Sequence, residues 1–171
     1  MNSRFSPNSE YLAGLLAGAA AEKLACVVGG LIAGPQGHIF VQKRALNRKL
    51  FPGCWDIVGG HVEPGETLVE ALAREVEEET GWTLTRIVDE IQILDWEVEV
   101  DEQIVRRREF DFLIEVAGDL TRPQIEVNNF TEFRWIDIDD LETLKENRDS
   151  GDLIIYESVK RALKVTRPPG V

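Results

Sequence analysis

Histidine and cysteine are scarce in this chain. Its 171 residues contain two cysteines, Cys26 and Cys54, and two histidines, His38 and His61. Two cysteines without paired spacing provide neither a disulfide framework nor a zinc motif, and two histidines without a third clustered ligand do not make a transition-metal site. We therefore expect both histidines in turns or loops and a reducing, cytoplasmic location.

Positive charge is also in deficit. The chain has 19 lysines and arginines against 31 acidic residues, which gives a net charge of −12 and a pI near 4.6. Such a surface repels nucleic acids and acidic membranes, and no apolar run approaches the length of a membrane span, so we expect neither partner. The one concentrated basic run, 106–108, either steers an anionic substrate or keeps a hairpin tip soluble. A phosphate ligand should be small and should arrive with a metal ion.

The N-terminal segment is rich in alanine and leucine from Leu12 to Leu24, but it is not a convincing export signal. Glu10 precedes it, and Glu22 and Lys23 interrupt its end. We expect an extra helix there, capped by Ser9.

The remaining pattern predicts one domain, since 171 residues with 43% hydrophobic content fit a single core. We expect an N-terminal helical extension over 1–24, the domain over 25–165 and a tail over 166–171. Strands are expected at 25–32 and 38–43, paired as a hairpin, and at 55–58, 84–99 with a break near 95, 108–116 and 133–138; helices are expected at 68–80, 141–148 and 153–165. Helices on both sides of the strands indicate a mixed sheet between helices.

The most informative segment is 60–82, GHVEPGETLVEALAREVEEETGW. Thr67 followed by Glu70 is a capping box, so a helix should begin near Leu68, and Gly81 can end it in the left-handed conformation. At 100° per residue, this helix carries one apolar stripe, made by Leu68, Leu72 and Val76.

Three glutamates of this helix, Glu75, Glu78 and Glu79, are expected beside the stripe, whereas Glu70 and Glu77 should face water. Crowding at the edge of a buried face raises the pKa of carboxyl groups unless a cation compensates. Mg²⁺ suits this role because it binds carboxylate oxygens together with substrate phosphates. A purely solvated acidic face is the alternative, and an EF-hand is not, because the alternating Asp/Asn ligands are missing.

The segment resembles the Nudix box, Gly-x5-Glu-x7-Arg-Glu-U-x-Glu-Glu-x-Gly-U, where U is a bulky apolar residue. Every fixed position is filled, by Gly60, Glu66, Arg74, Glu75, Val76, Glu78, Glu79 and Gly81. The final U is Trp82, where an aliphatic residue is usual. The resemblance implies an α/β/α sandwich with a mixed sheet, and hydrolysis of a nucleoside diphosphate linked to another moiety with Mg²⁺ or Mn²⁺ as cofactor.

The resemblance also implies roles for individual residues. Glu75 would be the base or a metal ligand, with Glu78 and Glu79 as further ligands. Arg74 would orient a glutamate, and Gly60 would offer its backbone carbonyl to the metal. Glu66 would fix the loop that precedes the helix onto the helix.

Two positions outside the box extend this site. Arg44, at the end of the second expected strand, matches an arginine that touches substrate phosphates in the family, although a solvated strand-end arginine is the alternative. Family members often carry an extra metal-binding carboxylate six residues before a tryptophan; here Asn129 precedes Trp135. Substitutes for that ligand could be Glu126, Glu132, Glu109 or Asp111.

The expected substrate is a nucleoside or deoxynucleoside triphosphate, cleaved to the monophosphate and pyrophosphate; which nucleotide is not indicated. Family members specialised for ADP-ribose often have a proline about fifteen residues beyond the box, where this chain has Trp96. Trp96, Phe130 or Trp135 could stack on the base. A ligand sensor without turnover, an interaction scaffold and an enzyme similar to isopentenyl diphosphate isomerase stay open, although the setting around Cys54 lacks the isomerase pattern. The sequence also leaves a homodimer open.

Overall fold

The computed structural model describes residues 7–166, so the expected tail lies outside the described residues except for Thr166. The elements are, in order, α1 (Ser9–Ala21), β1 (Ala25–Ile32), η1 (Pro35–Gly37), β2 (Ile39–Arg44), β3 (Trp55–Asp56), β4 (Val58–His61), α2 (Leu68–Thr80), β5 (Thr83–Val100), β6 (Gln103–Ala117), β7 (Phe130–Ile136), η2 (Leu141–Lys145) and α3 (Ile154–Thr166). No helix in this part of the chain is long and apolar enough to cross a membrane.

The strands form two sheets. The larger has the order β4-β1-β6-β5 and is mixed, because β1 and β6 run parallel whereas the other neighbours are antiparallel. The smaller has the order β3-β2-β7 and is antiparallel. The mixed sheet confirms the expected fold class, but the predicted hairpin of β1 and β2 is wrong, since a single bridge between Ala33 and Ile39 joins them. β1 is apolar on both faces and takes two partners distant in sequence instead.

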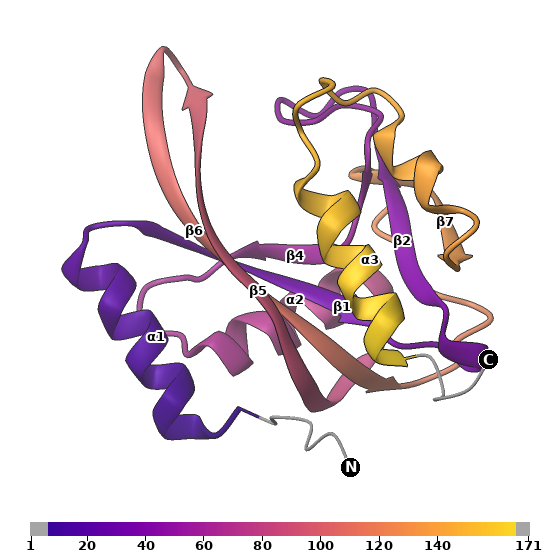
Figure 1. Cartoon of the computed structure of the whole chain (residues 1–171), viewed down its shortest axis with the longest axis horizontal. Coiled ribbons are helices and arrows are strands. Elements are labelled where there is room, and N and C mark those ends of the chain that lie inside the picture. Colours follow the sequence, from indigo (N-terminus) through magenta and orange to yellow (C-terminus); the bar gives the residue numbers. More distant parts are fainter. Residues whose placement is uncertain (1–6, 167–171) are drawn as a thin grey trace.

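Helices cover the two sides of the sheets (Figure 1). α1 and α2 pack on one face of the larger sheet around Val28, Phe110 and Phe112. On the other side, α3 packs with Leu31 and Leu113 into a second core that also includes the inner residues of β2. The resulting α/β/α arrangement leaves an edge of α2 beside β4, where the acidic motif lies.

The motif helix has the predicted bounds, Leu68–Thr80, and the predicted capping interactions are present at both of its ends. Thr67 accepts a hydrogen bond from the backbone of Glu70, whose carboxylate accepts one from the backbone of Thr67, and Gly81 has a φ of 71°. The expected N-terminal helix is also present, but its cap is Asn8 rather than Ser9, because Asn8 is extended and its side chain accepts from the backbone of Tyr11.

Two further predictions are corrected. The strand expected to break near Asp95 is continuous through Val100, and its register shifts lie earlier, between residues 84 and 92. β5 and β6 form a long hairpin that projects from the body and turns at Asp101 and Glu102, as expected (Figure 1). The helix expected at 141–148 is a short 3-10 turn, Leu141–Lys145, whose buried Leu141 and Leu144 suit a three-residue repeat.

An aromatic cluster joins the end of α2 to the smaller sheet. The Trp82 ring lies edge-on to Phe40 of β2 with centroids 5.1 Å apart, and it stacks on Trp135 of β7 at 5.9 Å. The indole nitrogen of Trp82 donates to the backbone carbonyl of Asp119 at 3.0 Å. The aromatic residue at the last motif position therefore connects α2 with β2 and β7.

Candidate active site

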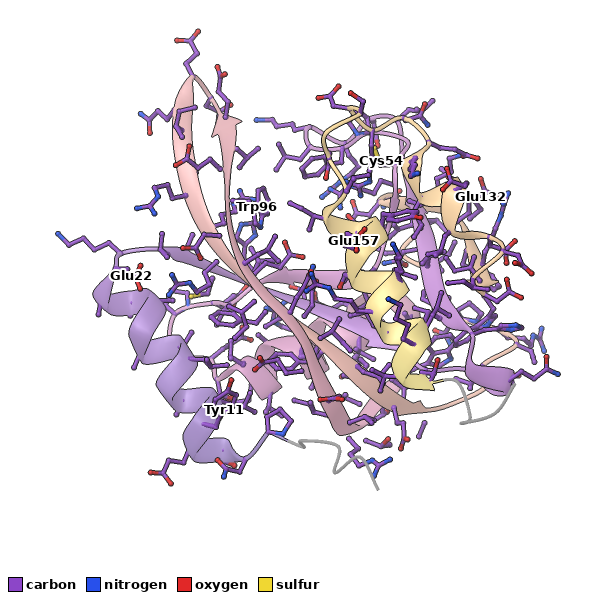
Figure 2. The ribbon with its side chains drawn as sticks, viewed as in Figure 1. Tyr11, Glu22, Cys54, Trp96, Glu132 and Glu157 are labelled. Atoms are coloured by element: carbon purple, nitrogen blue, oxygen red, sulfur yellow. The ribbon has the colours of Figure 1, made fainter. Side chains whose placement is uncertain are left out.

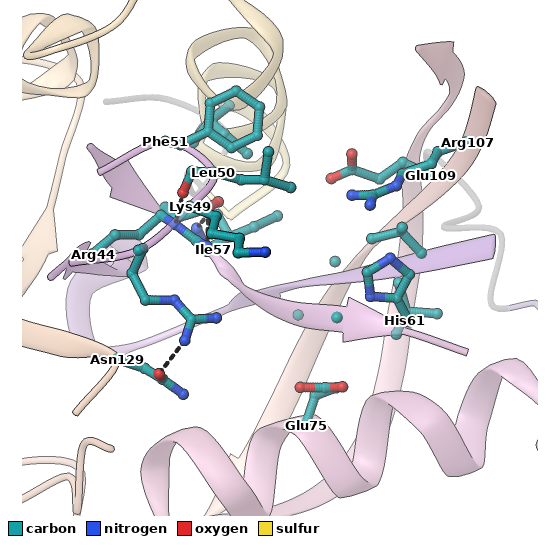
Figure 3. A pocket seen from close by; sticks show the side chains of 18 of the residues that line it. Arg44, Lys49, Leu50, Phe51, Ile57, His61, Glu75, Arg107, Glu109 and Asn129 are labelled. Carbon is teal, nitrogen blue, oxygen red and sulfur yellow. Dashed lines mark hydrogen bonds and ion pairs between the residues drawn. The ribbon is translucent and has the colours of Figure 1, made fainter. Parts of the chain in front are cut away.

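An open pocket of about 890 Å³ lies where α2, β4, the loop 45–57 and the β5–β6 hairpin converge (Figure 3). Glu75, Glu78 and Glu79 line it at the α2 end, together with Gly59 and Gly60 of β4. Arg44 and Asn129 lie on one wall, and Arg107, Glu109 and His61 lie on the opposite wall (Figure 3). The structure thus brings the motif glutamates and Arg44 to one cavity.

Arg74 organises the acidic end of the pocket. Its guanidinium donates to both oxygens of Glu66, at 2.8 and 2.9 Å, to Glu75 Oε1 at 2.7 Å and to the carbonyl of His61 at 3.0 Å. A longer contact of 3.4 Å reaches Glu78. These bonds lower the pKa of Glu66 to about 2, the side-chain bond from Arg74 being the largest cause. A charge-assisted fork of this kind fixes the loop before α2 onto the helix.

Glu75 lies directly under Gly60. The side chain of Glu75 is 13% exposed, and burial raises its pKa although Arg74 acts in the opposite direction. A Cβ at Gly60 would lie 2.3 Å from Glu75 Oε1, so only glycine leaves this carboxylate in its place. The glycine is required here by close approach rather than by an unusual backbone angle.

Glu79 is the most buried of the three glutamates, at 7% exposure. Its Oε2 accepts from Gln42 Nε2 at 2.7 Å and from the backbone nitrogen of Gly59 at 3.1 Å. Burial raises its pKa well above the usual value. Glu78 differs from the expectation of crowding, because its side chain is 57% exposed at the pocket rim; Glu77 faces solvent as expected.

These donors fit a divalent cation. Glu75 and Glu79 offer hard carboxylate oxygens whose negative charge is disfavoured by burial, and the backbone of Gly60 lies beside Glu75. Within residues 7–166, no three side chains of His, Cys, Asp or Glu are already arranged as a complete ligand set. In general, Mg²⁺ keeps several waters and takes further oxygens from substrate phosphates.

Arg44 lines the pocket, and its guanidinium already contacts other residues of the protein. Its Nε donates to the carbonyl of Leu50 at 3.0 Å, and its Nη1 lies 3.3 Å from Asp56 Oδ2. Asn129, at the position of the expected extra carboxylate, also lines the pocket and accepts a hydrogen bond from Arg48.

Of the four candidate substitutes for that carboxylate, two line the pocket and two do not. Glu109 and Glu126 line the pocket. Asp111 is fully buried and accepts from Ser158 and Gln92, whereas Glu132 pairs with Lys43 outside the pocket lining.

Of the three candidate stacking residues, two line the pocket and one does not. Trp96 and Phe130 line the pocket, and Trp96 projects from the hairpin toward the side of the molecule that carries Cys54 (Figure 2). Trp135 belongs to the aromatic cluster and does not line the cavity. Cys54 is buried outside the lining and donates to the carbonyl of Asn147 at 3.2 Å, so nothing in its setting supports isomerase chemistry.

The basic run resolves into three different environments. Arg106 is exposed near Glu97, and Arg108 pairs with Asp95 and Glu22 on the α1 side. Only Arg107 is buried and faces the pocket. Because side chains alternate along a strand, Arg107 points to the face opposite that of Arg106 and Arg108. The sequence contains this alternation, but it does not show which face of the strand lines the pocket.

His61 was expected in a turn or loop, but it lies on β4 and lines the pocket. Its pKa is lowered by burial, with a smaller contribution from the charge of Arg107. The shift favours the neutral imidazole on this wall.

Comparison with known proteins identifies the family of this chain. The NUDIX domain model matches residues 23–157. The chain is 31% identical over 119 residues to a protein of Klebsiella pneumoniae (strain 342) named nucleoside triphosphatase NudI, covering 66% of this chain and 82% of that protein. It is 33% identical over 112 residues to the protein of the same name from Escherichia coli (strain K12), covering 61% and 77%.

Solved structures show the same fold. A NUDIX hydrolase from Nitrosomonas europaea superposes with a TM-score of 0.64 at 20% identity, covering 85% of this chain and 93% of that one. The MutT protein from Methanosarcina mazei Go1 superposes with a TM-score of 0.58 at 22% identity, covering 85% and 96%. The chain therefore belongs to the Nudix family. It is a Nudix pyrophosphohydrolase.

Proposed function

We propose that this protein hydrolyses a nucleoside or deoxynucleoside triphosphate to the monophosphate and pyrophosphate, using Mg²⁺ or Mn²⁺. The observation that carries the proposal is one pocket that combines three carboxylates of α2 with arginines and an aromatic ring on its other walls. Relatives named nucleoside triphosphatase support the same substrate class. The reaction consumes one water and breaks the anhydride bond between the α and β phosphorus atoms.

The residues would divide the work by position. Glu75 would accept the proton of the attacking water or bind metal, and Glu78, Glu79 and the carbonyl of Gly60 would supply metal ligands. When bound, the divalent cation neutralises phosphate charge and lowers the pKa of a bound water. Arg74 would keep Glu75 oriented through its 2.7 Å bond.

Arg44 would bind the phosphates on the facing wall. Its present partner Asp56 is a single contact of 3.3 Å, which a phosphate with two or more oxygens can replace as a stronger acceptor for a planar guanidinium. This exchange would convert a structural ion pair into a substrate contact without moving β2.

The deciding experiment is hydrolysis of a nucleotide panel with Mg²⁺, Mn²⁺ or excess EDTA, with products separated by anion-exchange chromatography. We expect monophosphate and pyrophosphate in the metal-containing samples alone. Release of inorganic phosphate from triphosphates, or a clear preference for ADP-ribose or another diphosphate linkage, would overturn the substrate class but leave a metal-dependent hydrolase. Tight nucleotide binding without turnover would instead favour the sensor.

The cellular location is a smaller proposal. Both cysteines are free thiols in the structure, with Cys26 half-buried and Cys54 buried, in keeping with a reducing cytoplasm. Fractionation of cells that express the native protein would test this.

A further inference from the structure

One face of the β5–β6 hairpin carries polar and aromatic side chains into the pocket. In the strand register, Trp96 pairs with Arg107 and Leu94 pairs with Glu109. Arg107 and Glu109 are two residues apart on β6, so both project from the face that bears Trp96. All three of these polar or aromatic residues, Trp96, Arg107 and Glu109, line the pocket, and Figure 3 shows Arg107 and Glu109 side by side on its wall.

Folding alone leaves the guanidinium of Arg107 on this wall poorly satisfied. Arg107 is 8% exposed, its guanidinium lies over the Trp96 ring at 5.1 Å, and its Nε has no hydrogen-bond partner among residues 7–166. A buried donor without a partner is destabilising, and such groups are rare in folded proteins. An acceptor supplied by a ligand would satisfy the guanidinium.

Glu109 is equally enclosed, at 7% exposure. Its hydrogen-bonding neighbours are Asp111 and Trp96, and it makes no ion pair within 4.0 Å in the described part of the chain. Burial raises the pKa of its carboxyl well above the usual value, and repulsion from Asp111 adds to this. The Glu109 carboxyl offers acceptor oxygens beside the donors of Arg107, and this pair suits a base that presents a ring N–H next to a carbonyl group.

We propose that Trp96, Arg107 and Glu109 form a base-reading site that selects nucleotides whose base carries a carbonyl group over those with adenine. The guanidinium of Arg107 has donors but no acceptor, so it can satisfy a carbonyl oxygen and cannot pair with the amino group of adenine. Glu109 contacts the adjacent ring nitrogen, and Trp96 offers an apolar ring against the base. The inference rests on the proposed triphosphatase function and names the specificity of that same site.

A phosphate-binding role for Arg107 fits this wall less well. A phosphate beside Arg107 would also lie against Glu109, in a site with a buried carboxyl and an indole ring. Phosphate charge is better matched at the other end, where Arg44 and the metal-binding glutamates lie. A planar, uncharged base suits the aromatic ring and brings no negative charge against the Glu109 carboxyl.

The sharpest test compares dITP with dATP, since these nucleotides differ at position 6 in a carbonyl against an amino group. We expect kcat/KM of the native protein to favour dITP by about tenfold or more. In Arg107→Met the two values should come within about twofold of each other, mainly through a raised KM for dITP. Arg106→Met is the matched control, because Arg106 is exposed on the opposite strand face; it should keep the native preference.

Glu109 gives an independent pair of variants. Glu109→Gln keeps an acceptor oxygen at the same place and should keep the preference, whereas Glu109→Leu should reduce it. Circular dichroism melts identify any variant that does not fold, and the Gln and Arg107 variants then decide the question. Equal kcat/KM for dITP and dATP in the native protein would overturn the proposal, as would an Arg107→Met change that raises KM equally for both nucleotides.

Calorimetric titration with dIMP and dAMP in EDTA separates this inference from the proposed reaction. We expect tighter binding of dIMP, and loss of the difference in Arg107→Met. If no triphosphate is hydrolysed but the dIMP preference is present, the proposed reaction fails and the base-reading site stands. If triphosphates are hydrolysed and the binding difference is missing, the site fails alone.

Discussion

Replacing Gly60 by alanine tests whether the position of the Glu75 carboxylate controls the rate. An alanine Cβ would lie 2.3, 2.5 and 2.7 Å from Oε1, Cδ and Oε2 of Glu75, and real Cβ atoms essentially never approach closer than 3.0 Å. The carboxylate must therefore shift by at least about 0.7 Å, and by about 1 Å for an ordinary contact. A misplacement near 1 Å can lower a rate by about 10²-fold, so we expect kcat to fall between about tenfold and a hundredfold.

The melting temperature of Gly60→Ala should not fall together with its kcat. The backbone of Gly60 lies outside the left-handed region, and alanine restricts the unfolded chain, which stabilises proteins by roughly 0.4–1 kcal/mol where no strain opposes it. Displacing Glu75 offsets part of this, while Arg74 keeps its two bonds to Glu66. We expect a melting temperature close to that of the native protein.

The assay is steady-state turnover of a triphosphate together with thermal melting. Gly14→Ala is the control, because no atom lies within 4 Å of its added Cβ, and it should leave kcat unchanged. A Gly60→Ala protein with native kcat would refute the assigned role of the Glu75 carboxylate. In the double variant with Glu75→Gln, the Gly60 change should have little additional effect, since both changes act on the same group.

Three further predictions concern other parts of the site. Glu78→Gln and Glu79→Gln should each lose metal affinity by calorimetry and most of kcat, whereas the water-facing Glu77→Gln should be nearly silent; a large loss in the last would contradict the helix phase. Arg44→Ala should raise KM more than it lowers the melting temperature, and native KM with reduced stability would mean that Arg44 is structural. The pKa of Glu66 is lowered from 4.5 to about 2 in the folded state, so its stabilising contribution is present above pH 4.5 and lost as pH falls toward 2. Melts at pH 5 and pH 3 should therefore show a smaller loss for Glu66→Gln than for the native protein, and identical losses would rule out this ion pair as a source of acid sensitivity.

The parts of the structure that follow from local rules could be predicted from the sequence. The bounds of α2 depend on the cap at Thr67 and the left-handed Gly81, both within a turn of the helix ends. The separation of β1 from β2 could not be predicted, because it depends on partners far along the chain.

The same limit applies inside the site. Helical phase placed Glu75 and Glu79 correctly at the buried edge, but it could not show that Gln42 of β2 donates to Glu79. It also placed Glu78 too far inward, since exposure at the edge of a stripe depends on what packs beside it. Burial of Arg107 required the strand pairing as well as strand alternation.

The aromatic cluster at Trp82 affects the distance between two sides of the pocket. Trp82 follows the last turn of α2 and packs on Phe40 of β2, the strand that ends in Arg44. The ring volumes of this cluster therefore help to set the separation between the glutamates of α2 and Arg44. We expect loop replacement to leave this separation unchanged, and Trp82→Leu to let the α2 glutamates and Arg44 approach each other.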